Sequence, residues 1–300
     1  AICIQLERSG VEATWYHEEE PDNPISLAGL HAEDDCAGFR GALQSRWEIF
    51  VRDATRSNGT VVLESRLLQN ALAPQLRADT DQTAIASSLQ SIADTCVPLS
   101  PVLIYLEHTK YIQRLREICD LRGQNWKEHM VSRVEQGAFA RSRHIDGFDA
   151  LAQLMVATED IQRRFLSDTT MPCIQVDTSR GDWPRVQSEI CASQSIPHSK
   201  DAVSVAELRS LTGLYCCRHR ESSDEFTVEL VGDSLEVHDY PGFWPKDYRL
   251  IAKSPDVFFF ESFPFEMVFT RGSNRCAVEA SIVGPTAHWS LSDEPFKRMA

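Results

Sequence analysis

The chain has 300 residues, of which 42% are hydrophobic and 25% charged, and a formal net charge of −14. This length and composition predict two globular domains with sizeable cores. The negative charge argues against a surface that holds nucleic acid through its phosphates and against a polybasic membrane patch, although a local arginine cluster is still compatible with a small phosphorylated substrate.

The first residues, Ala1 to Ser9, have the pattern of an amphipathic helix, with Ile2 and Leu6 on one face. The sequence opens at an alanine and in the middle of this helical pattern. We therefore expect the natural N-terminus to lie upstream.

Short apolar runs alternate with long amphipathic stretches from residue 1 to about residue 196. Strands are predicted at Val11–His17, Thr60–Glu64, Val102–Glu107 and Cys173–Asp177. Helices are predicted at Phe39–Ser57, Gln82–Cys96, Tyr111–Leu121, Trp126–Gln136, Gly147–Leu166 and Trp183–Ala192. This alternation is typical of an α/β domain in which a parallel sheet has helices on both faces.

A small, polar segment at residues 197–206 is predicted to be a linker, and residues 207–300 form a second domain with a different pattern. Seven short strands separated by turn residues predict a small antiparallel β-barrel or sandwich. They are Leu214–His219, Phe226–Val231, Ser234–Val237, Tyr248–Ile251, Val257–Ser262, Met267–Thr270 and Cys276–Ile282. The stretch Leu211–Tyr215 resembles the opening strand of small lipocalin-like β domains.

Charged residues follow the ends of the predicted parallel strands, where α/β sheets bind their ligands. Glu18 to Glu20 follow the first strand, Glu64 and Arg66 the second, and the acidic Asp177 ends the fourth. Carboxylates at this edge can hold Mg²⁺ through water or accept a proton, and arginines can neutralise phosphoryl oxygens. Together these residue types favour phosphoryl transfer.

The order of these elements, with the motifs E-E-x-P-D-N-P, V-V-L-E-S-R-L-L-Q-N, P-V-L-I-Y-L-E and V-D-T-S, resembles P-loop kinases of the thymidylate and deoxynucleoside kinase superfamily. The resemblance covers residues 1 to 195 and implies a three-layer P-loop domain, with ATP as co-substrate and Mg²⁺ as cofactor. It gives Glu18 or Glu19 the role of general base, and Glu64 and Arg66 the organisation of metal-bound water and phosphate. It places Gln69 and Asn70 at the acceptor. It also assigns Arg114, Arg116 and Arg122 to a lid over the phosphates, and Thr178, Ser179 and Arg180 to the nucleotide base.

The phosphate loop of this superfamily, G-x-x-x-x-G-K-[ST], is not in the sequence. We expect it, together with the first strand, to precede Ala1. The leading hypothesis is an ATP-dependent phosphotransferase that acts on a small hydroxyl or phosphate acceptor and is inactive without that loop. The alternative is a non-catalytic, degenerate kinase fold that binds a ligand or a protein.

Each candidate residue also has a purely structural explanation. Glu18 to Glu20 fit a solvated acidic turn, and Glu64 with Arg66 fits an ion pair at a sheet edge. The arginines of 111–121 can pair with Glu117 and Asp120 on their own helix, and Asp177 can cap a helix. Ser65 lacks the G-x-S-x-G context of a hydrolase nucleophile.

The nine cysteines show neither C-x-x-C pairs nor the spacing of a metal site. They are predicted to be reduced, mostly buried thiols of a cytoplasmic protein. The sequence also lacks an apolar run of the ~18 residues that a membrane-spanning helix needs. The expected partner is a small-molecule substrate, because the net charge argues against nucleic acid and membrane surfaces. A homodimer is compatible with the sequence.

Overall fold

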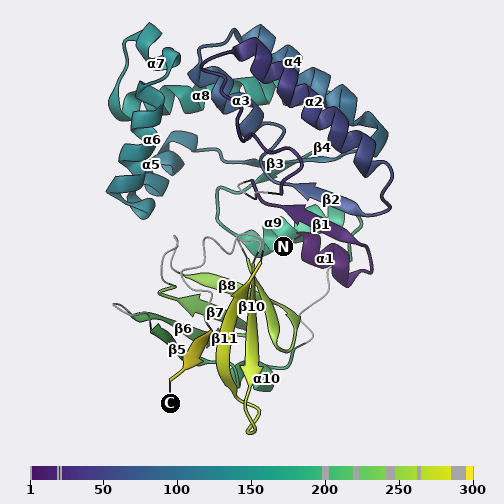
Figure 1. Cartoon of the computed structure of the whole chain (residues 1–300), viewed down its shortest axis with the longest axis vertical. Helices are drawn as coiled ribbons and strands as arrows, with labels where there is room; N and C mark the ends of the chain where they lie inside the picture. The colour runs from purple at the N-terminus through teal and green to yellow at the C-terminus, as the bar shows by residue number, and fades with distance from the viewer. Residues whose placement is uncertain are drawn as a thin grey trace. The chain divides into compact units, whose positions relative to one another are not determined.

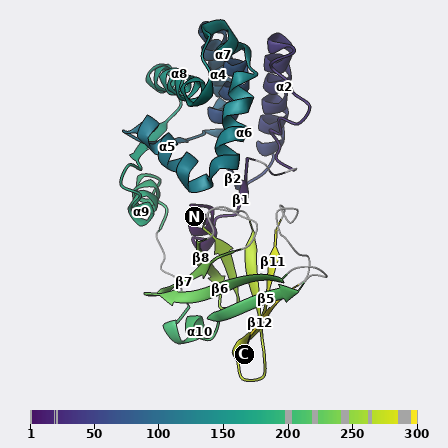
Figure 2. The same cartoon turned by 90° about the vertical axis from the view of Figure 1, so that its left-hand side faces the viewer.

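The structure is a computed structural model that describes residues 2–18, 20, 22–197, 203–218, 223–240, 247–261, 265–284 and 295–299. Its internal contacts divide the chain into one unit of residues 1–21 and 197–300 and another of residues 22–196 (Figures 1 and 2). Residues 1–21, expected in the α/β domain, thus group with the C-terminal strands. Within that unit Arg8 of α1 (Ile2–Arg8) donates to the main-chain oxygen of Ala252.

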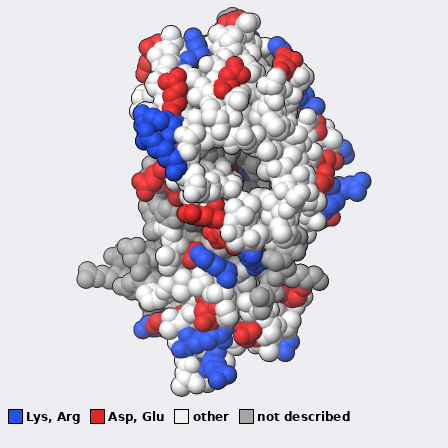
Figure 3. All heavy atoms as spheres, turned by 90° about the vertical axis from the view of Figure 1, so that its right-hand side faces the viewer, with Lys and Arg blue, Asp and Glu red and all other residues white. Residues whose placement is uncertain are grey.

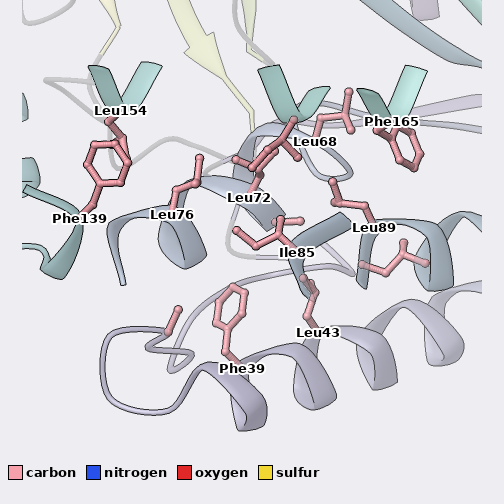
Figure 4. Packing of buried hydrophobic residues seen from close by; sticks show 14 of the residues in the cluster. Phe39, Leu43, Leu68, Leu72, Leu76, Ile85, Leu89, Phe139, Leu154 and Phe165 are labelled. Atoms are coloured by element: carbon pink, nitrogen blue, oxygen red, sulfur yellow. The ribbon is translucent and has the colours of Figure 1, made fainter. Parts of the chain in front are cut away.

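The core of residues 22–196 is built mainly by four helices. They are α2 (Cys36–Ala54), α3 (Gln69–Arg77), α4 (Gln82–Cys96) and α8 (Gly147–Asp168). Phe39 and Leu43 lie one turn apart on α2 and point towards α3 and α4, where Leu72 and Ile85 complete the contact (Figure 4). Aspartate side chains cap α2 and α4 at their N-termini by accepting main-chain N–H bonds.

The strands of this unit are β2 (Thr60–Leu63), β3 (Leu103–Glu107) and β4 (Cys173–Asp177). β3 and β4 pair in parallel as a two-stranded sheet, and β2 belongs to a different sheet. The described strands therefore do not form the continuous sheet expected from the alternation. Leu103 and Tyr105 face the helical core, whereas Val176 on the opposite face is buried in the region covered by α9 (Trp183–Ser193).

The link from β3 to β4 is helical. It contains α5 (Tyr111–Arg122), α6 (Gln124–Glu135), α7 (Ala138–Arg143) and α8. Two short helices of this unit, α3 and α7, were not among the predicted elements. α3 contains Pro74, which removes a main-chain donor and argues against a helix in the sequence, and the six residues of α7 are too few to show a helical period.

The C-terminal strands close into an eight-stranded antiparallel barrel, which confirms the barrel alternative of the prediction. The strands are β5 (Gly213–Arg218), β6 (Ser223–Val231), β7 (Ser234–His238), β8 (Tyr248–Ser254), β9 (Val257–Phe260), β10 (Glu266–Arg271), β11 (Ala277–Val283) and β12 (Phe296–Arg298). Each strand pairs with its neighbours in sequence, and β12 closes the barrel on β5. The same unit contains β1 (Ala13–Tyr16) and the short helix α10 (Val205–Arg209).

Aromatic side chains fill much of the barrel interior. Tyr215 stacks on Phe226 at a centroid distance of 5.4 Å, and Tyr240 lies 5.4 Å from Phe226 and 5.6 Å from Phe260. The Tyr215 hydroxyl donates to the main-chain oxygen of Leu211 at 2.6 Å, which anchors the segment that enters β5. A barrel of eight strands has room for such a core of packed rings, so these residues stabilise the domain.

Several cysteines are buried as free thiols. They include Cys96, Cys119 and Cys191, and burial raises the pKa of Cys96 to about 11. In the described ranges, none of the helices has both the length and the apolar composition needed to cross a lipid bilayer. On the face drawn in Figure 3, acidic and basic side chains are interspersed.

Candidate functional site

Parallel strands β3 and β4 end side by side, and their last residues, Glu107 and Asp177, are directly opposite in register. Thr178 ties the two ends together, because its main-chain N–H and its hydroxyl both donate to the Glu107 main-chain oxygen at 2.8 Å. The loop that follows β3 and the loop that follows β4 therefore begin next to each other. This is the edge at which parallel α/β sheets bind ligands.

Hydroxyl groups join the two loops beyond the strand ends. The Thr109 main-chain N–H donates to the Ser179 hydroxyl at 2.9 Å, and the Thr109 and Ser179 hydroxyls are also 2.9 Å apart. Ser179 in turn donates its main-chain N–H to the Asp177 carboxylate at 2.8 Å. Hydrogen bonds from the side chain and main chain of Ser179 lower the pKa of Asp177. Asp177 therefore carries a stable negative charge at neutral pH.

Two arginines bring positive charge to this edge. Arg163 on α8 donates to Glu107 at 2.7 Å and to Glu159 at 2.8 Å. Arg185 on α9 donates to the Asp177 main-chain oxygen at 2.6 Å and pairs with Glu189 at 2.8 Å. Both guanidinium groups are thus matched with carboxylates in this structure.

The turn after β2 and the first residues of α3 together hold four of the predicted site residues. Ser65, with φ of 60°, takes the left-handed conformation that is uncommon outside glycine, and its main-chain oxygen accepts from Asn70 at 2.9 Å. The Ser65 hydroxyl lies 3.4 Å from the Gln69 side-chain oxygen. Arg66 is only 4% exposed, and Glu64 is half-buried. A buried arginine beside a strained residue is a feature often associated with functional sites.

The other predicted residues are dispersed. Glu18 is half-buried in the unit of residues 1–21 and 197–300, and Glu19 lies outside the described residues. Arg114 pairs with Glu117 at 3.2 Å, as the structural explanation of these arginines predicts. Arg116 lies over the Phe148 ring and Arg122 over the Trp126 ring, at 5.5 and 4.7 Å from the ring centroids.

The structure thus brings Thr178 and Ser179 to the end of β3, with Arg180 exposed beside them. It places Glu64 and Arg66 in the turn after β2, and Gln69 and Asn70 at the start of α3. Sequence reasoning missed Glu159, Arg163 and Arg185. The spacing of Glu159 and Arg163 predicts an i,i+4 pair, but it does not show which strand end that face of the helix meets.

A magnesium site made by protein ligands alone is not found in the part of the chain that the structure describes. Among the described residues, no cluster of three or more His, Cys, Asp or Glu side chains is placed to hold a metal ion. Protein-bound Mg²⁺ often uses one or two carboxylates and completes its shell with water and substrate phosphates. Glu64 is a single half-buried carboxylate, so a cation bound there would need water or substrate for its other ligands.

A hollow of about 360 Å³ lies between α4, α5, α7 and α8. Ile112, Phe139 and Val156 give it an apolar lining, and Gln82 and Gln153 add carboxamides. Arg143, at its rim, is held by Asp79 at 2.6 Å. The hollow is shallow and largely open to solvent, and the Asp160 carboxylate also lines it.

Comparison of the sequence and fold with protein-family models, with curated proteins and with solved structures gives no match.

Proposed function

We propose that this chain is part of an ATP-dependent phosphotransferase of the nucleoside or nucleotide kinase type, acting on a small acceptor with a hydroxyl or phosphate group. The observation that carries the proposal is the pair of strand ends at Glu107 and Asp177. They are parallel, in register, and followed by loops linked through the hydroxyls of Thr109 and Ser179. Such an edge offers main-chain donors, hydroxyls and charge at one place.

In this proposal the loop of Thr178, Ser179 and Arg180 binds the nucleotide base or ribose. Glu64 holds water in the shell of Mg²⁺, and Arg66 neutralises phosphoryl oxygens. Mg-ATP supplies the transferred phosphoryl group. The family resemblance also implies a base at Glu18 or Glu19, but Glu18 belongs to the other unit and Glu19 lies outside the described residues, so the proposal gives neither of them a role.

The phosphate loop is proposed to reach the site on a further strand. β3 uses one edge to pair with β4, and among the described residues its other edge has no strand partner. β2, with the Glu64–Arg66 turn at its end, lies in the same unit as β3 but is not part of the β3–β4 sheet. A further strand that paired in parallel with the open edge of β3 would end beside Glu107, and the proposal places the phosphate loop there.

The hollow between α4, α5, α7 and α8 is the proposed place for the acceptor. Its apolar lining fits a ring system, and the carboxamides of Gln82 and Gln153 can each donate and accept a hydrogen bond. This assignment predicts that Gln153→Ala weakens binding of the acceptor and leaves binding of the nucleotide unchanged.

The test compares the 300-residue protein with the one translated from upstream of the codon for Ala1. We expect the longer protein to melt at a higher temperature with Mg-ATP and to transfer phosphate to a nucleoside. Glu64→Gln and Arg66→Lys should each lower turnover by orders of magnitude. The matched control is Glu48→Gln, which changes an exposed carboxylate on α2. Normal turnover in the Glu64 and Arg66 variants would refute the roles given to these residues.

A non-catalytic binding role is the second candidate, and one observation favours it. Arg163 and Arg185 are already neutralised by carboxylates, so they offer less to a phosphate than uncompensated arginines would. If the longer protein shows neither a melting shift with Mg-ATP nor phosphate transfer, this role is the better explanation.

A further inference from the structure

Asn58 is followed by Gly59, and this is the sole Asn-Gly pair in the sequence. The pair lies between α2 and β2, outside helix and strand, and Asn58 is exposed. The Gly59 main-chain N–H donates to the Ser57 hydroxyl at 3.3 Å, near the outer limit of a hydrogen bond. Because Gly59 has no Cβ, the approach of its nitrogen to the Asn58 side chain is unhindered.

We infer that Asn58 is a site of spontaneous deamidation. The Gly59 nitrogen loses its proton to solvent base and attacks the Asn58 carboxamide carbon, forming a C–N bond and a five-membered succinimide. The original C–N bond of the Asn58 carboxamide breaks and ammonia leaves. Water then opens the ring at one of its two carbonyls, which yields aspartate or isoaspartate at position 58. The step needs only water and base and involves no change of oxidation state.

Two other positions with an Asn or Asp side chain that could form a succinimide have hydrogen bonds that oppose the reaction. The Asn274 side-chain oxygen accepts the Cys276 main-chain N–H at 3.0 Å, and the residue after Asn274 is an arginine. At Asp146-Gly147, the aspartate counterpart, the Gly147 nitrogen donates to Glu135 at 2.6 Å and starts α8. Asn58 combines an exposed amide with a glycine nitrogen held by one long hydrogen bond.

The position gives the modification a structural consequence. Asn58 is two residues before β2, the strand that leads to the turn of Glu64 and Arg66. Aspartate adds a negative charge and leaves the main chain unchanged. Isoaspartate also inserts a methylene group into the main chain just before the strand, and should therefore shift the start of β2.

The test is ageing of the folded protein at physiological temperature and mildly alkaline pH, followed by tryptic mapping. Cleavage after Arg56 and Arg66 isolates the segment Ser57–Arg66. We expect most of this peptide to convert to aspartate and isoaspartate forms while most Asn274 stays an amide. The rate should rise with pH, because the attacking nitrogen must lose its proton.

Gly59→Val is the matched variant, since Gly59 is not among the positive-φ glycines and a side chain adds bulk beside the attacking nitrogen. We expect it to retain Asn58 under the same conditions. Asn58→Asp should keep the melting temperature of the unaged protein, whereas the isoaspartate fraction of the aged wild-type protein should melt lower. If the Asn58 amide survives as long as that of Asn274, or if Gly59→Val converts at the wild-type rate, the inference is overturned.

Discussion

Arg163 on α8 and Glu107 at the end of β3 form an ion pair at 2.7 Å that joins a long helix to the edge of the parallel strand pair. The same guanidinium pairs with Glu159, one turn earlier on α8. Glu107 therefore has a fixed orientation, and its main-chain oxygen meanwhile accepts both bonds from Thr178. The candidate site is thus held by the helix as well as by the strands.

The Arg163–Glu107 pair should contribute little to global stability. Its side chains are 49% and 26% exposed, so water screens the attraction. We expect Arg163→Met to lower the free energy of unfolding by less than about 1 kcal/mol. Urea unfolding of the single variants and of Arg163→Met with Glu107→Gln gives the coupling energy. A coupling well above that of exposed pairs would show that the pair is more desolvated than its exposure indicates.

Asp177 should titrate below its ordinary pKa of 3.8, because hydrogen bonds from Ser179 stabilise its charged form. The unfolded protein then binds this proton more tightly. The stabilisation from Asp177 is therefore present above pH 3.8 and is lost as the pH falls through the lowered pKa. NMR titration of the carboxyl carbon checks this. Ser179→Ala should move the pKa back towards its ordinary value, whereas Thr109→Ala should leave it low; equal titration in all three proteins would contradict the proposed cause.

Neighbouring phenylalanines of β9 give a matched test of the barrel core. Phe260 is 1% exposed inside the barrel, whereas Phe259 is half-buried and lies under Lys253 at 5.0 Å. Phe260→Ala should destabilise the barrel by about 3–5 kcal/mol, because it leaves a cavity among packed rings. Phe259→Ala should lower the free energy of unfolding clearly less, because this side chain is only half-buried. Chemical denaturation of both variants measures the difference, and equal losses would mean that the in–out alternation of β9 is wrong.

Arg271 joins three segments near one end of the barrel. It pairs with Asp256 and donates to the Ser210 hydroxyl, to the Arg275 main-chain oxygen at 2.7 Å and to the Pro255 main-chain oxygen at 3.1 Å. Arg271→Met should lower the free energy of unfolding by about 1–3 kcal/mol, because these acceptors lose a charged donor. Arg271→Lys should recover part of the loss. Lys253→Met, which removes an exposed pair with Glu266, is the control and should have little effect.

Much of the secondary structure could be predicted from the sequence because its signals are local. The predicted helix at Gln82–Cys96 and the predicted strand at Cys173–Asp177 have the observed bounds of α4 and β4. The strand runs after Gly213 were sufficient for a barrel or sandwich, but the choice between them depends on β12 pairing with β5. β12 has three residues, too few for a recognisable alternation.

The candidate site was harder to predict, because its members are joined by tertiary contacts. Thr178 and Ser179 were chosen from their place after a strand, and that signal is local. Arg163 lies within a long amphipathic helix, where Arg163 with Glu159 and Arg164 with Asp160 both fit an i,i+4 pair. Its distinction is the contact with Glu107, far away in sequence, which no pattern within α8 contains.

The closure of β12 on β5 has a consequence for how the barrel folds. All other pairings in the barrel join strands that follow one another in sequence, so they can form as successive hairpins. The β12–β5 pairing is the one that must bring together strands far apart in sequence. β12 has three residues with which to form it, and of these Phe296 is buried. We expect β12 to dock late and to open first. Native-state hydrogen exchange should therefore show the Met299 amide, which donates to Leu214, exchanging before the amides of the β6–β7 hairpin.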